Sequence, residues 1–110
     1  MLQITSLLSQ EDENKFIASS SFLIIDDFSG MRTMLSGVLR NCGANPKAID
    51  FAADGREALH LMSSKRYDVV LCDFNLGTGQ NGMQVLEEAR HRQLIGPSCC
   101  WVMVTADKTV

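Results

Sequence analysis

The chain has 110 residues, of which 45% are hydrophobic and 21% are charged. These proportions are typical of one soluble globular domain, and the length leaves little room for a second core. The net charge of -3 and the scattered lysines and arginines argue against direct nucleic-acid binding by this segment. Because no apolar stretch approaches the roughly 20 residues that span a bilayer and no signal-peptide pattern is visible, we expect a cytoplasmic protein without a membrane segment.

Residues 1–20 are expected to be an N-terminal extension, and residues 21–110 the domain itself. The extension is polar, and acidic in its second half, with apolar residues that could mark short helical faces. Residues 21–25 are an apolar run that predicts a buried strand. The following helix is predicted from apolar residues at helical spacing and ends at Gly43. The members of this expected core stripe are Met31, Met34, Leu35, Val38 and Leu39.

A second strand and helix are predicted after Gly43. Pro46 opens a weaker strand that continues through Ile49 and Phe51. Asp54 and Glu57 resemble a capping box, in which each side chain accepts a hydrogen bond at the start of a helix. The apolar residues after them, Ala58, Leu61 and Met62, support a helix at this point.

A third unit and a last strand complete the pattern. Residues 69–72 are a continuous apolar run, which is typical of a strand covered on both faces. A glycine-rich loop connects this strand to a helix predicted at 83–92. Residues 101–104 are a fourth apolar strand that ends at Thr105.

This alternation predicts an α/β fold, a doubly wound parallel sheet with helices on both faces and right-handed crossovers. Ligands of such sheets bind beyond the carboxyl ends of the strands, where the strand order reverses. Asp26, Asp27, Asp73 and Thr105 all lie at predicted strand ends. We therefore expect these four side chains to share one site.

Clustered carboxylates favour a bound cation. Two of them about 4 Å apart repel by roughly 4 kcal/mol at an effective dielectric constant of about 20. A hard divalent cation such as Mg²⁺ relieves this conflict and can hold phosphate oxygens at its remaining positions. With the charge neutralised, Asp73 could attack a phosphorus centre and form an acyl phosphate.

Four sequence fragments now carry a resemblance to a known family. F-L-I-I-D-D-F-S-G-M-R, A-D-G-R-E-A-L, Y-D-V-V-L-C-D-F-N and V-M-V-T-A-D occur in the order found in receiver domains of bacterial two-component response regulators. The resemblance extends over residues 22–107, and D-D-F-S-x-M-R is especially similar to the chemotaxis regulators. It implies a flavodoxin-like receiver fold with strand order 2-1-3-4.

The resemblance also implies roles for individual residues. Asp73 would accept a phosphoryl group from a histidine kinase or phosphotransfer protein. Asp27 and Asp73 would bind Mg²⁺ through their side chains, Asp26 through water and Asn75 through its backbone carbonyl, while Thr105 would be the switch hydroxyl. Such a domain controls a downstream output domain or protein. It catalyses only its own aspartyl phosphorylation and dephosphorylation, so it is not an enzyme with a separate substrate.

Two features depart from the family pattern. Residues 76–81 form a loop about one residue longer than the usual Met-Pro turn, and its glycines favour mobility. The family's lysine ends a fifth strand, whereas Lys108 follows Thr105 too closely to take that role. We therefore expect a receiver truncated before its fifth strand, with the last strand and helices missing.

Truncation predicts self-association. Without an outer neighbour, the fourth strand would expose backbone donors and the apolar run 101–104. Two copies could pair these strands or exchange elements. The apolar face of the N-terminal extension could also cover the side left bare by the absent last helix.

Each candidate residue also has a purely structural interpretation. Asp26 and Asp27 could simply begin the next helix, because acids favour helix N-termini. Asp73 alone could be a solvated residue at a strand end, and Thr105 a β-branched strand residue. Arg32 could be a phosphate ligand, but a solvated helix position is the favoured interpretation.

The histidines, the cysteines and the loop glycines are expected to have structural roles. His60 and His91 lack partners at metal-ligand spacing and are predicted to lie on the surface. The cysteines show no C-x-x-C spacing, which predicts free thiols. Gly77, Gly79 and Gly82 are not followed by Lys-Ser or Lys-Thr, so a flexible connection is expected rather than a phosphate loop. The cysteines are Cys42, Cys72, Cys99 and Cys100.

Three functional hypotheses are compared. The first is a receiver switched by phosphorylation. The second is a protein-docking module of the same fold that works without phosphorylation. The third, a metal-dependent phosphatase with an aspartyl nucleophile, requires an acid shortly after Asp73, where Asn75 cannot donate a carboxyl proton. The first hypothesis accounts for most of the pattern.

Overall fold

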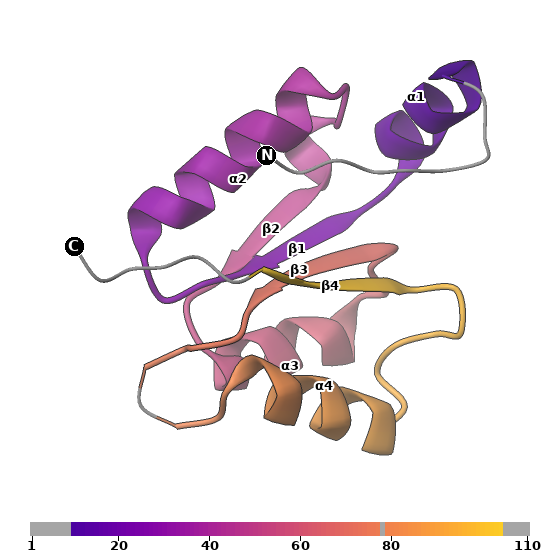
Figure 1. Cartoon of the computed structure of the whole chain (residues 1–110). Coiled ribbons are helices and arrows are strands. Elements are labelled where there is room, and N and C mark those ends of the chain that lie inside the picture. The colour runs from indigo at the N-terminus through magenta and orange to yellow at the C-terminus, as the bar shows by residue number, and fades with distance from the viewer. Residues whose placement is uncertain (1–9, 78, 105–110) are drawn as a thin grey trace.

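A computed structural model describes residues 10–77 and 79–104 of the chain (Figure 1). Strands and helices alternate after an N-terminal helix, as the apolar pattern predicts. No helix in the described ranges has the length and apolarity needed to cross a bilayer. The elements are α1 (Gln10–Ser19), β1 (Phe22–Ile25), α2 (Ser29–Asn41), the 3₁₀ helix η1 (Pro46–Ala48), β2 (Ile49–Ala52), α3 (Gly55–Ser64), β3 (Val69–Asp73), α4 (Gly82–His91) and β4 (Cys100–Val104).

The four strands form a parallel sheet in the order β2-β1-β3-β4. Figure 1 shows α1 and α2 on one face of this sheet and α3 and α4 on the other. The predicted doubly wound α/β fold and its 2-1-3-4 strand order are therefore confirmed. Because β1 and β3 are neighbours in the middle of the sheet, the residues that follow them meet at the same edge.

Each face of the sheet has its own apolar core. All residues of β1 and β3 are buried, as expected for strands covered on both sides. The core under α3 and α4 contains Leu23, Ile25, Ala52, Ala58, Leu59, Met62, Tyr67, Val70, Cys72, Leu76, Val85 and Ala89. The core under α1 and α2 contains Ile17, Phe22, Ile24, Leu35, Leu39, Ala44, Ile49, Val69 and Leu71.

Two local predictions are wrong. Pro46 begins the helical turn η1, in which Asn45 caps the Lys47 N–H, and the strand starts only at Ile49. Proline suits the first position of such a turn because its missing N–H has no partner there. Met34 is 54% exposed, since it lies at the margin of the α2 apolar stripe rather than in the core.

Other local predictions are confirmed. The Asp54 half of the predicted capping box is observed, since Asp54 accepts a hydrogen bond from the Glu57 N–H at 2.8 Å and so caps α3. Helix α2 ends at Asn41, and Gly43 follows with a φ of +106°, a conformation that glycine adopts without a steric cost.

Helix α1, within the expected N-terminal extension, packs directly on the sheet. Its Ile17 is 8% exposed and belongs to the core shared with Phe22 and Leu39, whereas the adjacent Phe16 is 46% exposed. The Ser20 hydroxyl donates a hydrogen bond to the Phe16 carbonyl and holds the turn into β1. Helix α1 therefore forms part of the structural core.

The Ile17→Ala substitution should lower the free energy of unfolding by about 2 kcal/mol or more, because it leaves a cavity between α1 and the sheet. The matched Phe16→Ala variant removes an exposed side chain and should change stability by less than about 0.5 kcal/mol. Urea denaturation of both variants measures the difference. Equal effects would show that α1 does not contribute to the core.

Candidate functional site

Three carboxylates meet at the carboxyl edge of the sheet. Asp26 and Asp27 follow β1, and Asp73 is the last residue of β3. The parallel register pairs Ile25 with Cys72 and so brings the next residue of each strand together. One oxygen atom from each of the three carboxylates lies within 4.8 Å of the others. The sequence-predicted convergence is observed, while the role of each residue stays a prediction.

Asp26 is held firmly at the base of this site. Its side chain is 1% exposed, and its Oδ1 accepts a hydrogen bond from the Phe28 N–H at 2.9 Å. Its own N–H donates to the Ala52 carbonyl on β2. On the α2 side, Arg32 Nη1 donates to the Asp26 carbonyl at 2.7 Å. Arg32 lies in α2, as the favoured interpretation has it, and its side chain is partly exposed.

Asp73 and the loop after it form the other side of the site. The Asp73 side chain is 4% exposed, and its Oδ1 accepts a hydrogen bond from the Asn75 N–H at 3.4 Å. The Asn75 Oδ1 in turn accepts one from the Gly77 N–H at 3.2 Å. Asn75 thus lies next to the site, and the use of its backbone carbonyl as a ligand stays a prediction. Thr105 lies outside the described residues.

Two glycines allow the loop to close on the carboxylates. Gly82 begins α4, and a Cβ there would lie 2.5 Å from the Asp73 carbonyl oxygen and 2.8 Å from Met103 Sδ. Gly77 has a φ of +77°, and a Cβ there would lie 3.3 Å from Asp27 Oδ2. The prediction from the sequence that these glycines form a flexible connection did not anticipate the two close approaches. The capping residue Asn81 directly before Gly82 was the available signal for a fixed helix start.

The site is strongly negative, and the adjacent Cys72 responds to this charge. Burial, followed by the charges of Asp73 and Asp26, raises the pKa of the Cys72 thiol from its ordinary value of 9.0 to about 12. The Cys72 Sγ contacts the Asp73 carbonyl oxygen at 3.3 Å. Cys72 therefore stays protonated and packs as a small apolar side chain.

The donor set fits a hard divalent cation. All three groups are carboxylates, and three such charges within a few ångströms repel unless protons or a cation balance them. Two of the three are buried, while Asp27 is exposed and leaves the site open toward solvent. A cation that binds a few carboxylates and keeps several waters, as Mg²⁺ does, suits this geometry.

The histidines and cysteines do not join the carboxylate cluster in the described part of the chain. His60 and His91 are exposed, as the sequence predicts. All four cysteines are free thiols, which confirms the absence of a disulfide among them.

Comparison with known proteins gives a consistent result. Residues 22–110 match the response regulator receiver domain family. The chain is 37% identical over 68 residues to the chemotaxis protein CheY of Pseudomonas aeruginosa, which is 62% of this chain and 52% of that protein. It is equally similar to CheY-3 of Vibrio cholerae, covering 62% of this chain and 50% of that one. The chain thus spans about half the length of these curated relatives.

Solved structures show the same fold. CheY4 of Vibrio cholerae superposes with a TM-score of 0.68 at 28% identity, covering 82% of this chain and 71% of that one. TrrA of Thermotoga maritima, solved in complex with Mg(2+)-BeF, gives a TM-score of 0.67 at 29% identity, covering 81% and 71%. Both therefore support the same fold for this chain.

The Gly82→Ala substitution should destabilise the protein by about 1–3 kcal/mol, because the new methyl group would press on the Asp73 backbone. The matched Gly37→Ala variant, in the middle of α2, has no atom within 4 Å of the added Cβ. It should stabilise the protein by about 0.5–1 kcal/mol. Thermal or urea unfolding distinguishes the two, and a neutral Gly82→Ala would contradict the tight loop closure.

The free energy of unfolding should fall as the pH rises from 9.0 toward about 12, the interval between the ordinary and the folded pKa of Cys72. A raised folded pKa contributes stability that is complete below the unfolded pKa and is lost above it, because only the unfolded chain then releases the proton. Urea denaturation should show a shallower fall for Cys72→Ala than for wild type. The variant of the exposed Cys42, Cys42→Ala, should follow wild type; identical slopes for all three proteins would disprove the contribution of Cys72.

Proposed function

We propose, because this chain belongs to the response regulator receiver domain family, that Asp73 accepts a phosphoryl group and that the domain signals through its phosphorylation state. The observation that supports this most directly is the meeting of Asp26, Asp27 and Asp73 within 4.8 Å at the carboxyl edge of the sheet. Parallel α/β sheets bind their ligands at this edge.

Asp73 is the proposed nucleophile. Its carboxylate oxygen attacks the phosphorus of a phosphohistidine donor, a P–O bond forms, and the P–N bond breaks with its electron pair leaving on the imidazole nitrogen. The attacking group must lie at a fixed position, and the β3 register with Val104 and the contact with Gly82 hold the Asp73 backbone there. Asp26 Oδ1 accepts the Phe28 N–H at 2.9 Å, a shorter hydrogen bond than the 3.4 Å one between the Asn75 N–H and Asp73 Oδ1, so the Asp26 carboxylate is the more firmly held of the two.

The proposed cofactor is Mg²⁺. Asp27 and Asp73 would hold it through their side chains, Asp26 through a water molecule and Asn75 through its backbone carbonyl. When bound, it would neutralise the carboxylates and the transferring phosphoryl oxygens. Support comes from the oxygen-only donor set at this edge and from TrrA, a structural neighbour solved with Mg(2+)-BeF.

The proposed partners follow from the family. A histidine kinase or phosphotransfer protein would supply the phosphoryl group in the cytoplasm, and a downstream output domain or protein would respond to it. Thr105 would act as the switch hydroxyl. The domain would catalyse only its own phosphorylation and dephosphorylation, so it would have no separate substrate.

Incubation with a small phosphoramidate donor and Mg²⁺ should add one phosphoryl group to the chain, detected by intact mass. The Asp73→Asn variant, which removes the nucleophile but preserves the shape of the side chain, should gain none. The Asp54→Asn variant should behave as wild type, because asparagine also caps a helix and Asp54 lies outside the acidic site.

Removal of Mg²⁺ by a chelator should prevent the mass gain, because the cation would no longer neutralise the transferring phosphoryl oxygens beside the carboxylates. A folded wild-type protein that gains no phosphoryl group with Mg²⁺ present would contradict the proposal. That outcome would favour the alternative, a docking module of the same fold that works without phosphorylation.

A further inference from the structure

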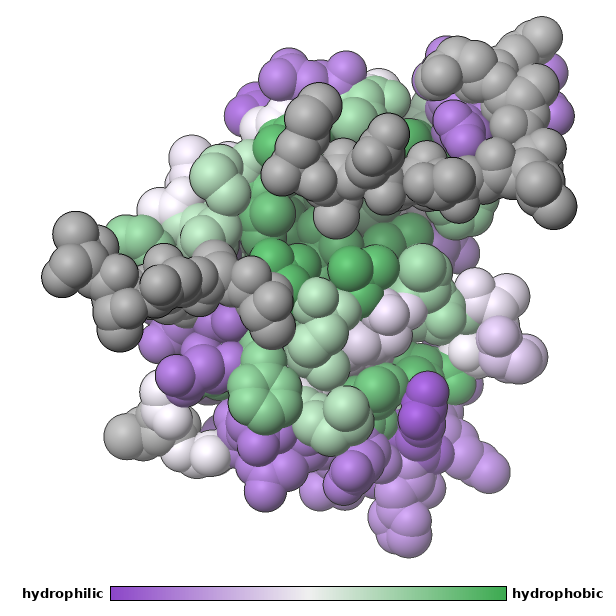
Figure 2. All heavy atoms as spheres, viewed as in Figure 1, coloured by the Kyte–Doolittle hydropathy of each residue, from purple (hydrophilic) through white to green (hydrophobic). Residues whose placement is uncertain are grey.

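Burial helps to fix two of the three carboxylates of the acidic site. Figure 2 shows hydrophobic side chains gathered over the middle of the molecule, where Figure 1 places β1, β3 and β4. Asp26 and Asp73 lie at the end of this apolar layer and are only 1% and 4% exposed. Asp27 is the exposed member of the three. Burial therefore does not hold Asp27 as it holds the other two.

The peptide group between Asp26 and Asp27 is held from the α2 side. Near the start of α2, Arg32 donates a hydrogen bond from Nη1 to the Asp26 carbonyl at 2.7 Å. This carbonyl belongs to a planar peptide unit that also contains the nitrogen and Cα atoms of Asp27. On either side of it, the Asp26 N–H donates to the Ala52 carbonyl, and the Phe28 N–H donates to Asp26 Oδ1. The Arg32 hydrogen bond therefore sets the orientation of the peptide plane from which Asp27 extends.

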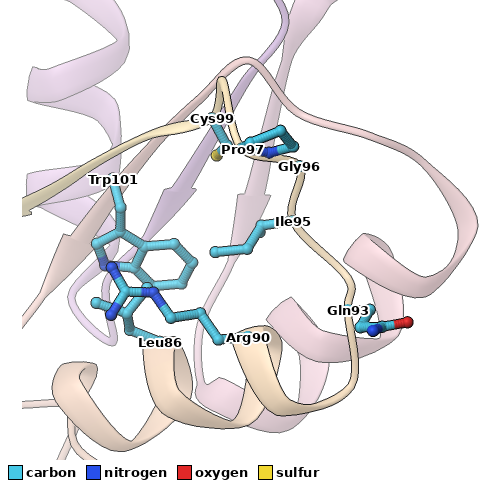
Figure 3. A pocket seen from close by; sticks show the side chains of 8 residues that line it. All are labelled: Leu86, Arg90, Gln93, Ile95, Gly96, Pro97, Cys99 and Trp101. Carbon is cyan, nitrogen blue, oxygen red and sulfur yellow. The ribbon is translucent and has the colours of Figure 1, made fainter.

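Two other arginines lie toward the opposite end of the sheet, where α3 and α4 end (Figure 1). Arg66 follows α3, and its Nη1 donates to the Gln93 carbonyl at 3.0 Å. Arg90, in the last turn of α4, lines a cavity beside β4, and Figure 3 shows it next to the Trp101 ring. Arg32, by contrast, brings its guanidinium group to the backbone of the acidic site.

We propose that Arg32 is a positioning residue for cation binding, whose hydrogen bond to the Asp26 carbonyl holds Asp27 in the direction in which Asp27 binds Mg²⁺. This inference rests on the proposed cation site. Arg32 acts through the backbone and does not contact the cation, because two positive charges repel. Removal of a group that orients a metal ligand typically lowers metal affinity by about 10- to 100-fold.

The direction of the change in Mg²⁺ affinity distinguishes positioning from two other roles of Arg32. By Coulomb's law alone, a guanidinium beside three carboxylates opposes a bound cation, so its removal would strengthen Mg²⁺ binding. If Arg32 only attached α2 to the end of β1, its removal would lower stability and leave the affinity of the folded protein unchanged. Positioning of Asp27 predicts weaker binding.

Titration of the full chain with MgCl₂, followed by NMR at the backbone amides of residues 26–28, measures the dissociation constant. Arg32→Met keeps an apolar stem but removes the donor and the charge, and it should raise this constant about tenfold. Arg40→Met removes an equal charge about 12 Å further along α2, and it should change the constant by less than about twofold. Arg32→Lys keeps the charge and one possible donor but loses the planar fork, and it should give an intermediate value.

Amide hydrogen exchange without Mg²⁺ tests the same contact independently of the cation. In Arg32→Met the Phe28 N–H, which donates to Asp26 Oδ1 at 2.9 Å, should exchange about fivefold faster than in wild type. The Glu57 N–H makes an equivalent hydrogen bond to Asp54 Oδ1 at 2.8 Å at the start of α3. Its exchange should match wild type, which separates a local effect at the site from a general loss of stability.

Unchanged or stronger Mg²⁺ binding by Arg32→Met or Arg32→Lys would overturn the positioning role of Arg32. A wild-type exchange rate at Phe28 in Arg32→Met would overturn it as well. In either case, saturable binding by the wild-type and Arg40→Met proteins would leave the proposed cation site standing. A wild-type protein that does not bind Mg²⁺ would overturn the cation site itself, and the role of Arg32 with it.

Discussion

The convergence of three carboxylates at one edge of a parallel sheet is the constraint on which the rest of the structure depends. Parallel register makes it unavoidable, because β1 and β3 end side by side and each is followed or terminated by aspartate. Neighbouring groups hold the geometry against the repulsion. Arg32 binds the Asp26 backbone, and Gly82 permits α4 to begin against Asp73. The site thus gathers three carboxylates whose mutual repulsion a divalent cation can reduce.

Most of the fold and the place of the site could be predicted from the sequence. Continuous apolar runs identify β1 and β3 as buried strands, and an aspartate at the end of each run gives the site its location. The predictions failed where a local pattern admits two structures. Pro46 suits a helical turn as well as a strand start, and Met34 lies at the margin of an apolar stripe.

The support around the site could not be predicted, because it depends on distances between segments. Nothing in the local pattern shows that the Arg32 side chain reaches the Asp26 carbonyl, or that Gly82 lies against the Asp73 backbone. The same holds for Ile17, whose burial depends on where α1 lies relative to the sheet. Such contacts become visible only when the elements are placed in three dimensions, and they decide how rigidly the carboxylates are held.

The acidic site lies at the carboxyl end of the sheet, whereas apolar side chains lie along strand β4. The carboxyl edge concentrates negative charge, whereas β4 presents an uncharged strand with partly exposed side chains on both faces. At the β2 edge, Asp50 accepts hydrogen bonds from Lys65 and Tyr67, and a charged residue of this kind discourages pairing with another strand.

The most direct test of the central claim is the melting temperature as a function of Mg²⁺ concentration. If the three carboxylates form one cation site, Mg²⁺ should raise the melting temperature of the wild-type protein in a saturable manner, because it binds the folded state. The increase should be largely lost in Asp27→Asn and retained in Asp54→Asn. An equal response of all three proteins would contradict a shared site of Asp26, Asp27 and Asp73.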